Sequence, residues 1–479
     1  MLTRLMLLCF LYLPFVPSTF GEELFDLEYI RDAESLEVRV IEDWRPHPNM
    51  SDIQQKLVEI VVAEWWQGQK VRIPVTLNAP MDSETLPCRH VIVANMPLKF
   101  RTATPNGPSL ELLRENGVGV VLVGMGTIDA MAPAGQLHLG MEAQLLKTKS
   151  PRYSSAWIWG MSQMRGLTAA IAEPNYFQPE KVVSTGGSKR GIATSIAGIH
   201  DDRFTGIMPV VAPPHGNPGR PVAVRGLEPV WIADQNRQFL DTVDPGIRSS
   251  LGQRTLRRNV GRITLNDALR NGWSEEDMVG LNDRLFNASR ITGYLEAVNE
   301  RGLAYLYNVG TNDSVTPALL ELGNKYPHFP VYIVPGGQHG GPGDAGYTRR
   351  VTVQPEVVRN FDSFCRLHFF GSGPVPQAPT ISGVRKGDRF VVTSRFQSGV
   401  RAVSNELAWS FDRHRPYTFP FEYDHWDASL MKEMDDGHWE SIIRIPAGAK
   451  SIQFVSTHQV ESDGYPFVLS SALKEIRLD

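Results

Sequence analysis

Residues 182–191 read Val-Val-Ser-Thr-Gly-Gly-Ser-Lys-Arg-Gly. An apolar, β-prone run leads into a glycine pair, a serine follows at position 188, and the small residues of 192–199 favour a helix. This succession of strand, tight turn, serine and helix is typical of a nucleophile elbow, which exposes a serine hydroxyl at the carboxyl edge of a sheet. We therefore expect a strained backbone at Ser188 and small residues around it, which the sequence supplies as Gly186, Gly187 and Gly191.

The elbow departs from its usual spacing. The pattern is G-x-S-x-x-G instead of G-x-S-x-G, because Arg190 holds the fifth position and Gly191 follows one residue later. The alternative interpretation is a glycine-rich strand-to-helix turn in which Ser188 only caps the helix N-terminus. The choice between the two depends on whether later strands supply catalytic partners.

The composition is that of an ordinary globular protein. The 479 residues are enough for two or three domains, at about 150 residues for each. Apolar residues make up 42% and charged residues 21% of the chain, and the net charge of -4 does not point to a nucleic acid or an anionic membrane as partner. Beyond Cys9 the chain has Cys88 and Cys365, and the sequence leaves open whether these two pair.

The first residues have the features of a secretory signal peptide. Arg4 precedes an apolar run at 5–16, and small residues within 17–21 suit a cleavage site. The run is too short for a comfortable membrane span. We expect residues 1–21 to be the signal peptide of a secreted or periplasmic protein; an uncleaved anchor or a buried segment is the alternative.

A hairpin followed by alternating strands and helices is expected after this segment. The hairpin consists of 57–66 and 70–77. Short, nearly all-apolar runs indicate strands that are buried on both faces, as in a parallel sheet; they lie at 91–94, 118–124, 181–185, 206–212, 303–309 and 331–334. Helical segments lie at 109–115, 156–173 and 355–370. This order predicts an α/β-hydrolase fold over residues 22–372.

Two further regions interrupt or follow the hydrolase pattern. Residues 213–300 contain many Arg, Asn and Asp and no strand pattern, so we expect a helical cap insertion there. A Gly/Pro-rich linker at 371–379 is followed by short alternating runs separated by turns. These runs predict an immunoglobulin-like β-sandwich domain over 376–479.

The catalytic partners of Ser188 are expected on loops after late strands. A serine hydroxyl needs a base within hydrogen-bond reach, and the base needs an acid that orients it. Asp313 follows the strand at 303–309, and His339 lies in a glycine-rich loop after the strand at 331–334. The order Ser188, Asp313, His339 is that of this fold, so we interpret the three residues as a catalytic triad.

Acyl transfer also requires donors for the developing oxyanion. The backbone N–H of Lys189 is one candidate. The other is expected in the loop after 91–94, where Pro97 has no N–H, so we choose Met96, with the Asn95 side chain as the alternative.

The basic residues after the serine admit two interpretations, a cationic environment for an acidic substrate or structural ion pairs. We favour the structural interpretation for Lys189 and take Arg190 as a candidate for binding substrate. We interpret His138, His200 and His215 as ordinary polar residues, and Trp157 and Trp159 as core. No cluster of His, Cys and carboxylates has metal-ligand spacing, and we expect no cofactor.

The segment Gly-Gly-Ser-Lys-Arg-Gly at 186–191, followed by Met-Pro-Val-Val at 208–211, resembles the PhoPQ-activated pathogenicity-related family. The resemblance implies an exported α/β-hydrolase with a C-terminal β-domain over most of the mature chain. The loops around Asp313 and His339 look more like those of hydrolases of the prolyl-oligopeptidase and acetyl-esterase types. Glucuronoyl esterases are similar in the late glycine and in a basic residue after the serine, which implies an ester of a sugar acid.

These features together predict a secreted serine hydrolase that cleaves a carboxylic ester, with a small molecule or a carbohydrate ester as substrate. A serine peptidase is the alternative among enzymes, because the same triad cleaves amides. Outside enzymes, the alternative is an exported binding protein on a hydrolase scaffold. We expect neither a nucleic acid partner nor a stable membrane span, and the oligomeric state is left open.

Overall fold

The computed structural model describes most of the chain. The described residues are 24–95, 104–128, 135–215, 259–260, 263–264, 271–313, 316, 318–339, 349–397, 400, 402–413 and 424–478. The expected signal peptide lies outside them, as does much of the expected cap at 213–300. Within the cap range, helix α9 (Glu275–Ser289) packs against the helix that follows the elbow.

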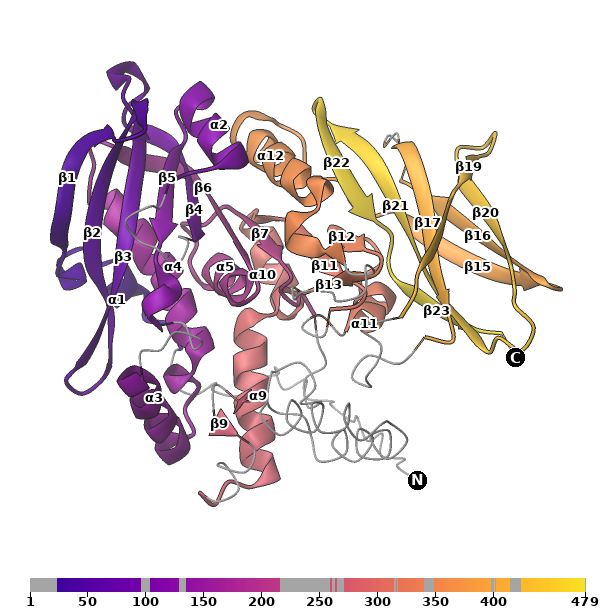
Figure 1. Cartoon of the computed structure of the whole chain (residues 1–479), viewed down its shortest axis with the longest axis horizontal. Coiled ribbons are helices and arrows are strands. Elements are labelled where there is room, and N and C mark those ends of the chain that lie inside the picture. Colours follow the sequence, from indigo (N-terminus) through magenta and orange to yellow (C-terminus); the bar gives the residue numbers. More distant parts are fainter. Residues whose placement is uncertain are drawn as a thin grey trace, which may run out of the picture.

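The central element is a mixed sheet in which a long antiparallel hairpin borders a parallel core (Figure 1). Its strands are β1 (Arg39–His47), β2 (Met50–Trp66), β3 (Gln69–Pro80), β4 (Cys88–Asn95), β5 (Gly119–Val123), β6 (Phe177–Gly187), β7 (Gly206–Val210), β10 (Ala304–Tyr305), β11 (Tyr307–Gly310) and β12 (Val331–Val334). Their order is β1-β2-β3-β5-β4-β6-β7-β11-β12, with β10 beside β7. The neighbours in the series β5-β4-β6-β7-β11-β12 pair in parallel, and β3 joins β5 antiparallel.

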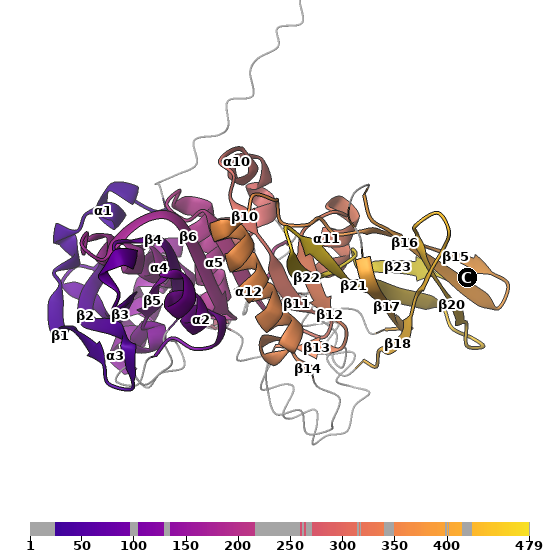
Figure 2. The ribbon, with the colours of Figure 1, turned by 90° about the horizontal axis from the view of Figure 1, so that it is seen from above.

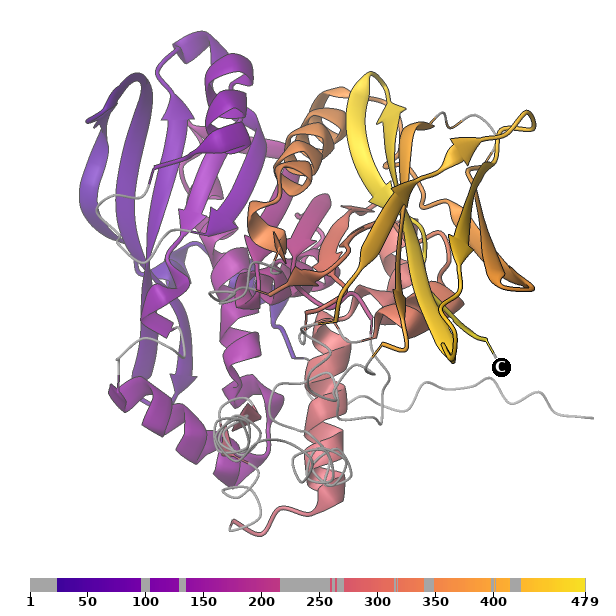
Figure 3. The same cartoon turned by 45° about the vertical axis from the view of Figure 1, so that its right-hand side comes forward.

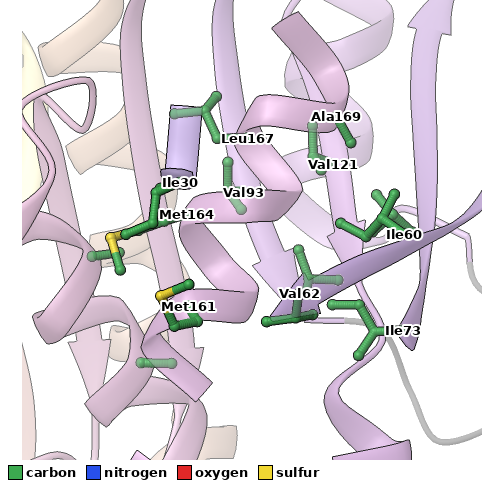
Figure 4. Close-up of a cluster of buried hydrophobic side chains, with 14 of the residues drawn as sticks. Ile30, Ile60, Val62, Ile73, Val93, Val121, Met161, Met164, Leu167 and Ala169 are labelled. Carbon is green, nitrogen blue, oxygen red and sulfur yellow. The ribbon is translucent and has the colours of Figure 1, made fainter. Parts of the chain in front are cut away.

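Helices cover both faces of this sheet, as double burial of its strands requires. They are α1 (Leu27–Arg31), α2 (Gly107–Asn116), α3 (Gly135–Thr148), α4 (Ser155–Ile171), α5 (Lys189–His200), α10 (Leu295–Glu300), α11 (Leu319–Lys325) and α12 (Pro355–Phe370). In β4, Val91 and Val93 point into the core beneath α4 and α5, whereas Ile92 points into the core beneath α2 and α12. Figure 4 shows Val93 with Met161 and Met164 of α4.

The strand order and the helices on both faces are those of the α/β-hydrolase fold, and this prediction is confirmed. The expected hairpin is present and longer than predicted. The run at 303–309 is divided into β10 and β11, both beside β7.

The C-terminal region forms two antiparallel sheets that pack face to face (Figures 1 and 3). One contains β15 (Thr380–Lys386), β16 (Arg389–Arg395), β20 (Trp439–Arg444) and β19 (Lys432–Glu433); the other contains β18 (Asp427–Leu430), β17 (Ala402–Phe411), β21 (Ser451–Ser462), β22 (Tyr465–Ser470) and β23 (Lys474–Arg477). Phe390, Leu407 and Phe454 lie in the core between the sheets. The predicted β-sandwich is therefore present.

The β-sandwich lies directly against the hydrolase region, at the end of the molecule opposite the N-terminal hairpin (Figure 2). Strand β22 packs on α12, where the Asn360 side chain donates a hydrogen bond to the carbonyl of Val468 at 2.9 Å and accepts one from its N–H at 2.8 Å. Ser470 makes equivalent contacts with Ile333 of β12. The two regions therefore share a boundary in which these hydrogen bonds lie beside a continuous apolar cluster that contains Phe467 and Phe364.

The structure answers whether Cys88 and Cys365 form a disulfide. Cys88 and Cys365 are free thiols, each buried in the hydrolase core. Burial raises the pKa of the Cys88 thiol to about 12, so it stays protonated at neutral pH.

Candidate active site

Ser188 stands between β6 and α5, at the carboxyl edge of the sheet. Its backbone has φ 61° and ψ -127°, a conformation that L-residues rarely adopt. The Ser188 N–H donates to the carbonyl of Val210 on β7 at 2.9 Å, which holds the turn in place. The Ser188 side chain makes no capping hydrogen bond to α5, so the helix-cap interpretation is wrong.

Two of the three flanking glycines are sterically required. A Cβ on Gly186 would lie 2.6 Å from Nδ2 of Asn95, and one on Gly191 would lie 2.8 Å from the carbonyl oxygen of Val210. The expectation was too broad for Gly187, where the nearest atom would be 3.4 Å away. Gly191, the late glycine of the motif, is therefore required because α5 approaches β7 too closely for a side chain at this position.

The structure brings Ser188, His339 and Asp313 together in a continuous hydrogen-bonded chain. Ser188 Oγ lies 2.5 Å from His339 Nε2, and His339 Nδ1 lies 3.1 Å from both carboxylate oxygens of Asp313. The Asp313 side chain is fully buried, and 19% of the His339 side chain is exposed. With the Nδ1 proton donated to Asp313, Nε2 is the ring nitrogen able to accept the Ser188 proton.

The loops that carry the acid and the histidine are joined by hydrogen bonds. The Gly336 N–H donates to Thr311 Oγ1 at 2.8 Å, and the Asn312 N–H donates to the carbonyl of Gly337 at 2.9 Å. A Cβ on Gly310 would collide with the Gly337 carbonyl, so only glycine permits this approach. These contacts fix the carboxyl ends of β11 and β12 relative to one another.

The expected oxyanion donors are only partly described. Lys189 is the first residue of α5, directly after Ser188. Met96 lies outside the described residues. The side chain of Asn95, the alternative, donates to the carbonyl of Thr185 at 3.3 Å.

Arg190 lies on the first turn of α5, two residues after Ser188, and is half-buried. Among the residues that the structure describes, none forms an ion pair or a hydrogen bond with the Arg190 guanidinium. Its charge is therefore not used in the described part of the fold, in contrast to the many arginines that pair with carboxylates.

Of His138, His200 and His215, the two whose side chains the structure describes make structural contacts, as expected. The ring of His200 bonds to the carbonyl of Ala288 at 2.9 Å, and burial lowers the pKa of His200 to about 4. His215 Nδ1 lies 2.9 Å from Thr292 Oγ1, and burial lowers the pKa of His215 to about 4 as well. The side chain of His138 is outside the described part of the structure.

The tryptophans near the start of α4 belong to the core. Trp157 is 4% exposed, and its Nε1 donates to the carbonyl of Leu24 at 2.6 Å. Trp159 packs against the same core. Within the described residues, no group of His, Cys, Asp and Glu side chains is arranged to hold a metal ion, and no helix has the length and apolarity needed to cross a membrane.

Sequence reasoning missed one set of contacts at this site. Residues Arg413, Asp424 and Trp426 of the C-terminal region reach the loop that carries Asp313. No local pattern marks these residues, since they meet the loop only after both regions have folded.

The sheet order and the Ser188–His339–Asp313 chain together define a protein of the α/β-hydrolase class with a serine-centred site. No family model and no curated protein matches the sequence. Among solved structures, the chain is similar to a glucuronoyl esterase from Solibacter usitatus, with 15% identity, a TM-score of 0.40, and 69% of this chain and 86% of that chain covered.

Two further solved structures have comparable similarity. One is an acetyl xylan esterase from Paenibacillus sp. R4, with 14% identity, a TM-score of 0.39, and coverage of 66% of this chain and 87% of that chain. The other is a CE15 glucuronoyl esterase from Caldicellulosiruptor kristjansonii, with 13% identity, a TM-score of 0.35, and coverage of 71% and 81%. These likenesses are remote, and the assignment of the fold rests on the strand order itself.

Proposed function

We propose that the protein is a serine hydrolase that cleaves a carboxylic ester through an acyl-enzyme. The single observation that carries this proposal is the chain of hydrogen bonds from Ser188 Oγ through the His339 ring to Asp313. A hydroxyl is a weak nucleophile unless a base removes its proton during attack, and this geometry places a base at that proton.

The reaction follows from the positions of these atoms. Ser188 Oγ attacks the carbonyl carbon while its proton passes to His339 Nε2, and the buried Asp313 carboxylate stabilises the imidazolium that forms. The tetrahedral intermediate then expels the alcohol, which takes the proton from Nε2. Water, deprotonated by His339, attacks the acyl-enzyme in the same way and releases the acid. We propose that the backbone N–H groups of Lys189 and Met96 donate hydrogen bonds to the oxyanion of the intermediate.

The substrate class is proposed from the charge beside the nucleophile. A half-buried guanidinium without a carboxylate partner among the described residues favours an anionic ligand, because Arg binds carboxylates through paired N–H groups. We therefore propose a small or carbohydrate ester that also carries a carboxylate, with Arg190 as its binding residue. Export, and membership of the PhoPQ-activated pathogenicity-related family, stay predictions from residues 1–21 and 186–191.

Covalent labelling tests the nucleophile. A fluorophosphonate probe should label Ser188 in the folded wild-type protein, and Ser188→Ala should abolish both labelling and turnover. Ser195→Ala is the matched control, because Ser195 lies on the same helix but bonds to Tyr307 and not to His339. If the folded wild-type protein is not labelled, the proposed enzyme activity is contradicted, and a binding protein on a hydrolase scaffold becomes the better explanation.

A substrate panel tests the chemistry and the role of Arg190. Turnover of 4-nitrophenyl esters with little turnover of aminoacyl anilides is expected; the reverse preference would indicate a peptidase. In Arg190→Gln, kcat/KM for the 4-nitrophenyl monoester of succinate should fall about tenfold, while the butyrate ester should change by less than about twofold. Equal losses for both esters would contradict a carboxylate-binding role.

A further inference from the structure

Residues of the C-terminal β-sandwich form hydrogen bonds with the loop that carries Asp313. Arg413 follows β17, and Asp424 to Trp426 precede β18. Strands β17 and β18 are neighbours in one sheet, so the two segments leave the sandwich together and reach the loop after β11. These segments and the loop are more than 100 residues apart in the chain.

The side chain of Asn312 makes three hydrogen bonds to these segments. Its Nδ2 donates to the carbonyl of Asp424 at 2.9 Å. Its Oδ1 accepts from the Arg413 guanidinium at 2.8 Å and from Trp426 Nε1 at 3.0 Å. The residue directly before Asp313 is thus bonded through both ends of its amide.

Arg413 is built into this contact. Its side chain is 1% exposed, and its guanidinium also donates to the carbonyl of Thr311 and to Gln453 Oε1, the latter at 3.0 Å. Asp424 Oδ2 lies 3.3 Å from Arg413 Nε. The Arg413 guanidinium lies 5.1 Å from the centre of the Trp426 ring. Burial lowers the pKa of Arg413 to about 10 while Asp424 opposes the decrease, so the group stays charged at neutral pH.

These bonds act on the orientation of Asp313. Thr311 and Asn312 are the two residues before Asp313, and the Asp313 N–H donates to the carbonyl of Gly310 at 3.3 Å. A rotation of this short loop would move the carboxylate away from His339 Nδ1. A buried acid can stabilise an imidazolium only from a fixed position beside it.

We propose that the β-sandwich is part of the catalytic unit, with Arg413 and Trp426 as positioning residues that act through Asn312 to hold Asp313 against His339. The inference rests on the proposed function of the triad. It assigns the C-terminal region a role inside the hydrolase site and predicts that the site is incomplete without that region.

Two variants of the full-length protein test this role. Trp426→Phe keeps an aromatic ring but removes the N–H donor. Asn312→Leu keeps the side-chain size but removes the three hydrogen bonds to the β-sandwich segments, together with the one that Oδ1 accepts from Thr311 Oγ1 at 3.1 Å. Trp439→Phe is the matched control, since Trp439 is a partly buried residue of β20 that packs against the core of the same β-sandwich. Thermal unfolding of each variant identifies those that are folded.

The expected result is a loss of kcat with little change in KM, because the interaction acts on the transition state. Trp426→Phe should lower kcat about tenfold and Asn312→Leu about 100-fold, and Trp439→Phe should stay within about twofold of wild type. The acid-side midpoint of the kcat/KM profile should also move to lower pH in the first two variants, because a displaced carboxylate stabilises the protonated ring less.

The outcomes separate this inference from the function on which it rests. A wild type that neither labels with the fluorophosphonate nor hydrolyses esters overturns the proposed function. An active wild type whose folded Trp426→Phe variant keeps wild-type kcat and pH profile overturns the positioning role. A loss that Trp439→Phe shares equally would also overturn it, because general loosening of the sandwich would then explain the effect.

Discussion

Ser188 has a backbone conformation that is unfavourable for any residue with a Cβ. Its φ of 61° and ψ of -127° match the first central position of a type II′ turn, where glycine is preferred because it has no Cβ. Such strain costs about 1–3 kcal/mol and persists only when the surroundings impose it. Here the N–H bond to the Val210 carbonyl and the entry into α5 impose it.

Replacing Ser188 with glycine should therefore stabilise the fold relative to alanine. Both Ser188→Gly and Ser188→Ala lose the bond to His339, so their comparison isolates the strain of the Cβ. We expect Ser188→Gly to be more stable than Ser188→Ala by about 1 kcal/mol, even though glycine gains entropy in the unfolded chain. Urea unfolding measures the difference, and an alanine variant as stable as the glycine variant would contradict the strain.

At the same scale, the sequence identified Ser188, Asp313 and His339 but not Arg413, Asp424 or Trp426. The first three lie on the turn or loops that follow β6, β11 and β12, and the order of strands in this fold places these at one edge. The others follow no motif, and their contacts with Asn312 depend on how two separately patterned regions pack.

Among elements, helix α4 combines a predicted apolar face with a buried arginine that the pattern did not anticipate. Arg165 is fully buried and donates to the carbonyls of Tyr29 at 2.8 Å, Asp32 at 2.9 Å and Val61 at 3.1 Å. These acceptors belong to α1, the residue that ends it, and β2. The arginine thus joins three elements that hydrophobic periodicity alone treats separately.

Loss of this arginine should destabilise the protein strongly. Arg165→Met keeps the length of the side chain but removes the guanidinium donors that link three backbone carbonyls, of which those of Tyr29 and Asp32 keep other donors. We expect a loss of about 3 kcal/mol in the free energy of unfolding. Arg72→Met is the control, because Arg72 pairs with Glu37 at the surface and such pairs contribute about 0–1 kcal/mol. Equal losses in urea unfolding would show that the buried carbonyls find other donors.

Strand boundaries at the same scale were predicted best where burial is complete. Strands β5, β7 and β12 are buried at every residue, and their predicted bounds lie within two residues of the observed ones. Strands β4 and β6 have exposed residues near their starts and begin earlier than predicted. Strand β1 was missed because it is an exposed edge strand with little apolar pattern, and only its pairing with β2 defines it.

In the whole molecule, several histidines are buried in the neutral state. Burial lowers the pKa of His200, His215 and His368 to about 4 and that of His458 to about 3. In the unfolded chain these rings accept protons near pH 6.5, whereas in the folded chain they stay neutral until much lower pH. The unfolded state therefore binds more protons between these values.

Stability should accordingly fall as the pH is lowered from about 6.5 toward about 4, with a slope of up to about 1.4 kcal/mol per pH unit for each histidine. Urea unfolding at several pH values measures this slope. His200→Phe, at a site bordered by Phe25 and Tyr294, should reduce it by removing one titrating ring. A slope unchanged by that variant would contradict the contribution of His200.

The sequence by itself determined the hydrolase order and the C-terminal β-sandwich, and it predicted the residues of the serine-centred site, because these follow from local hydrophobic periodicity and from loops at defined strand ends. The tertiary structure decided that Ser188 meets His339, that the cysteines stay apart and that the β-sandwich bonds to the loop of Asp313. These last features depend on contacts between residues far apart in the chain, which form only when both regions pack and which leave no local pattern.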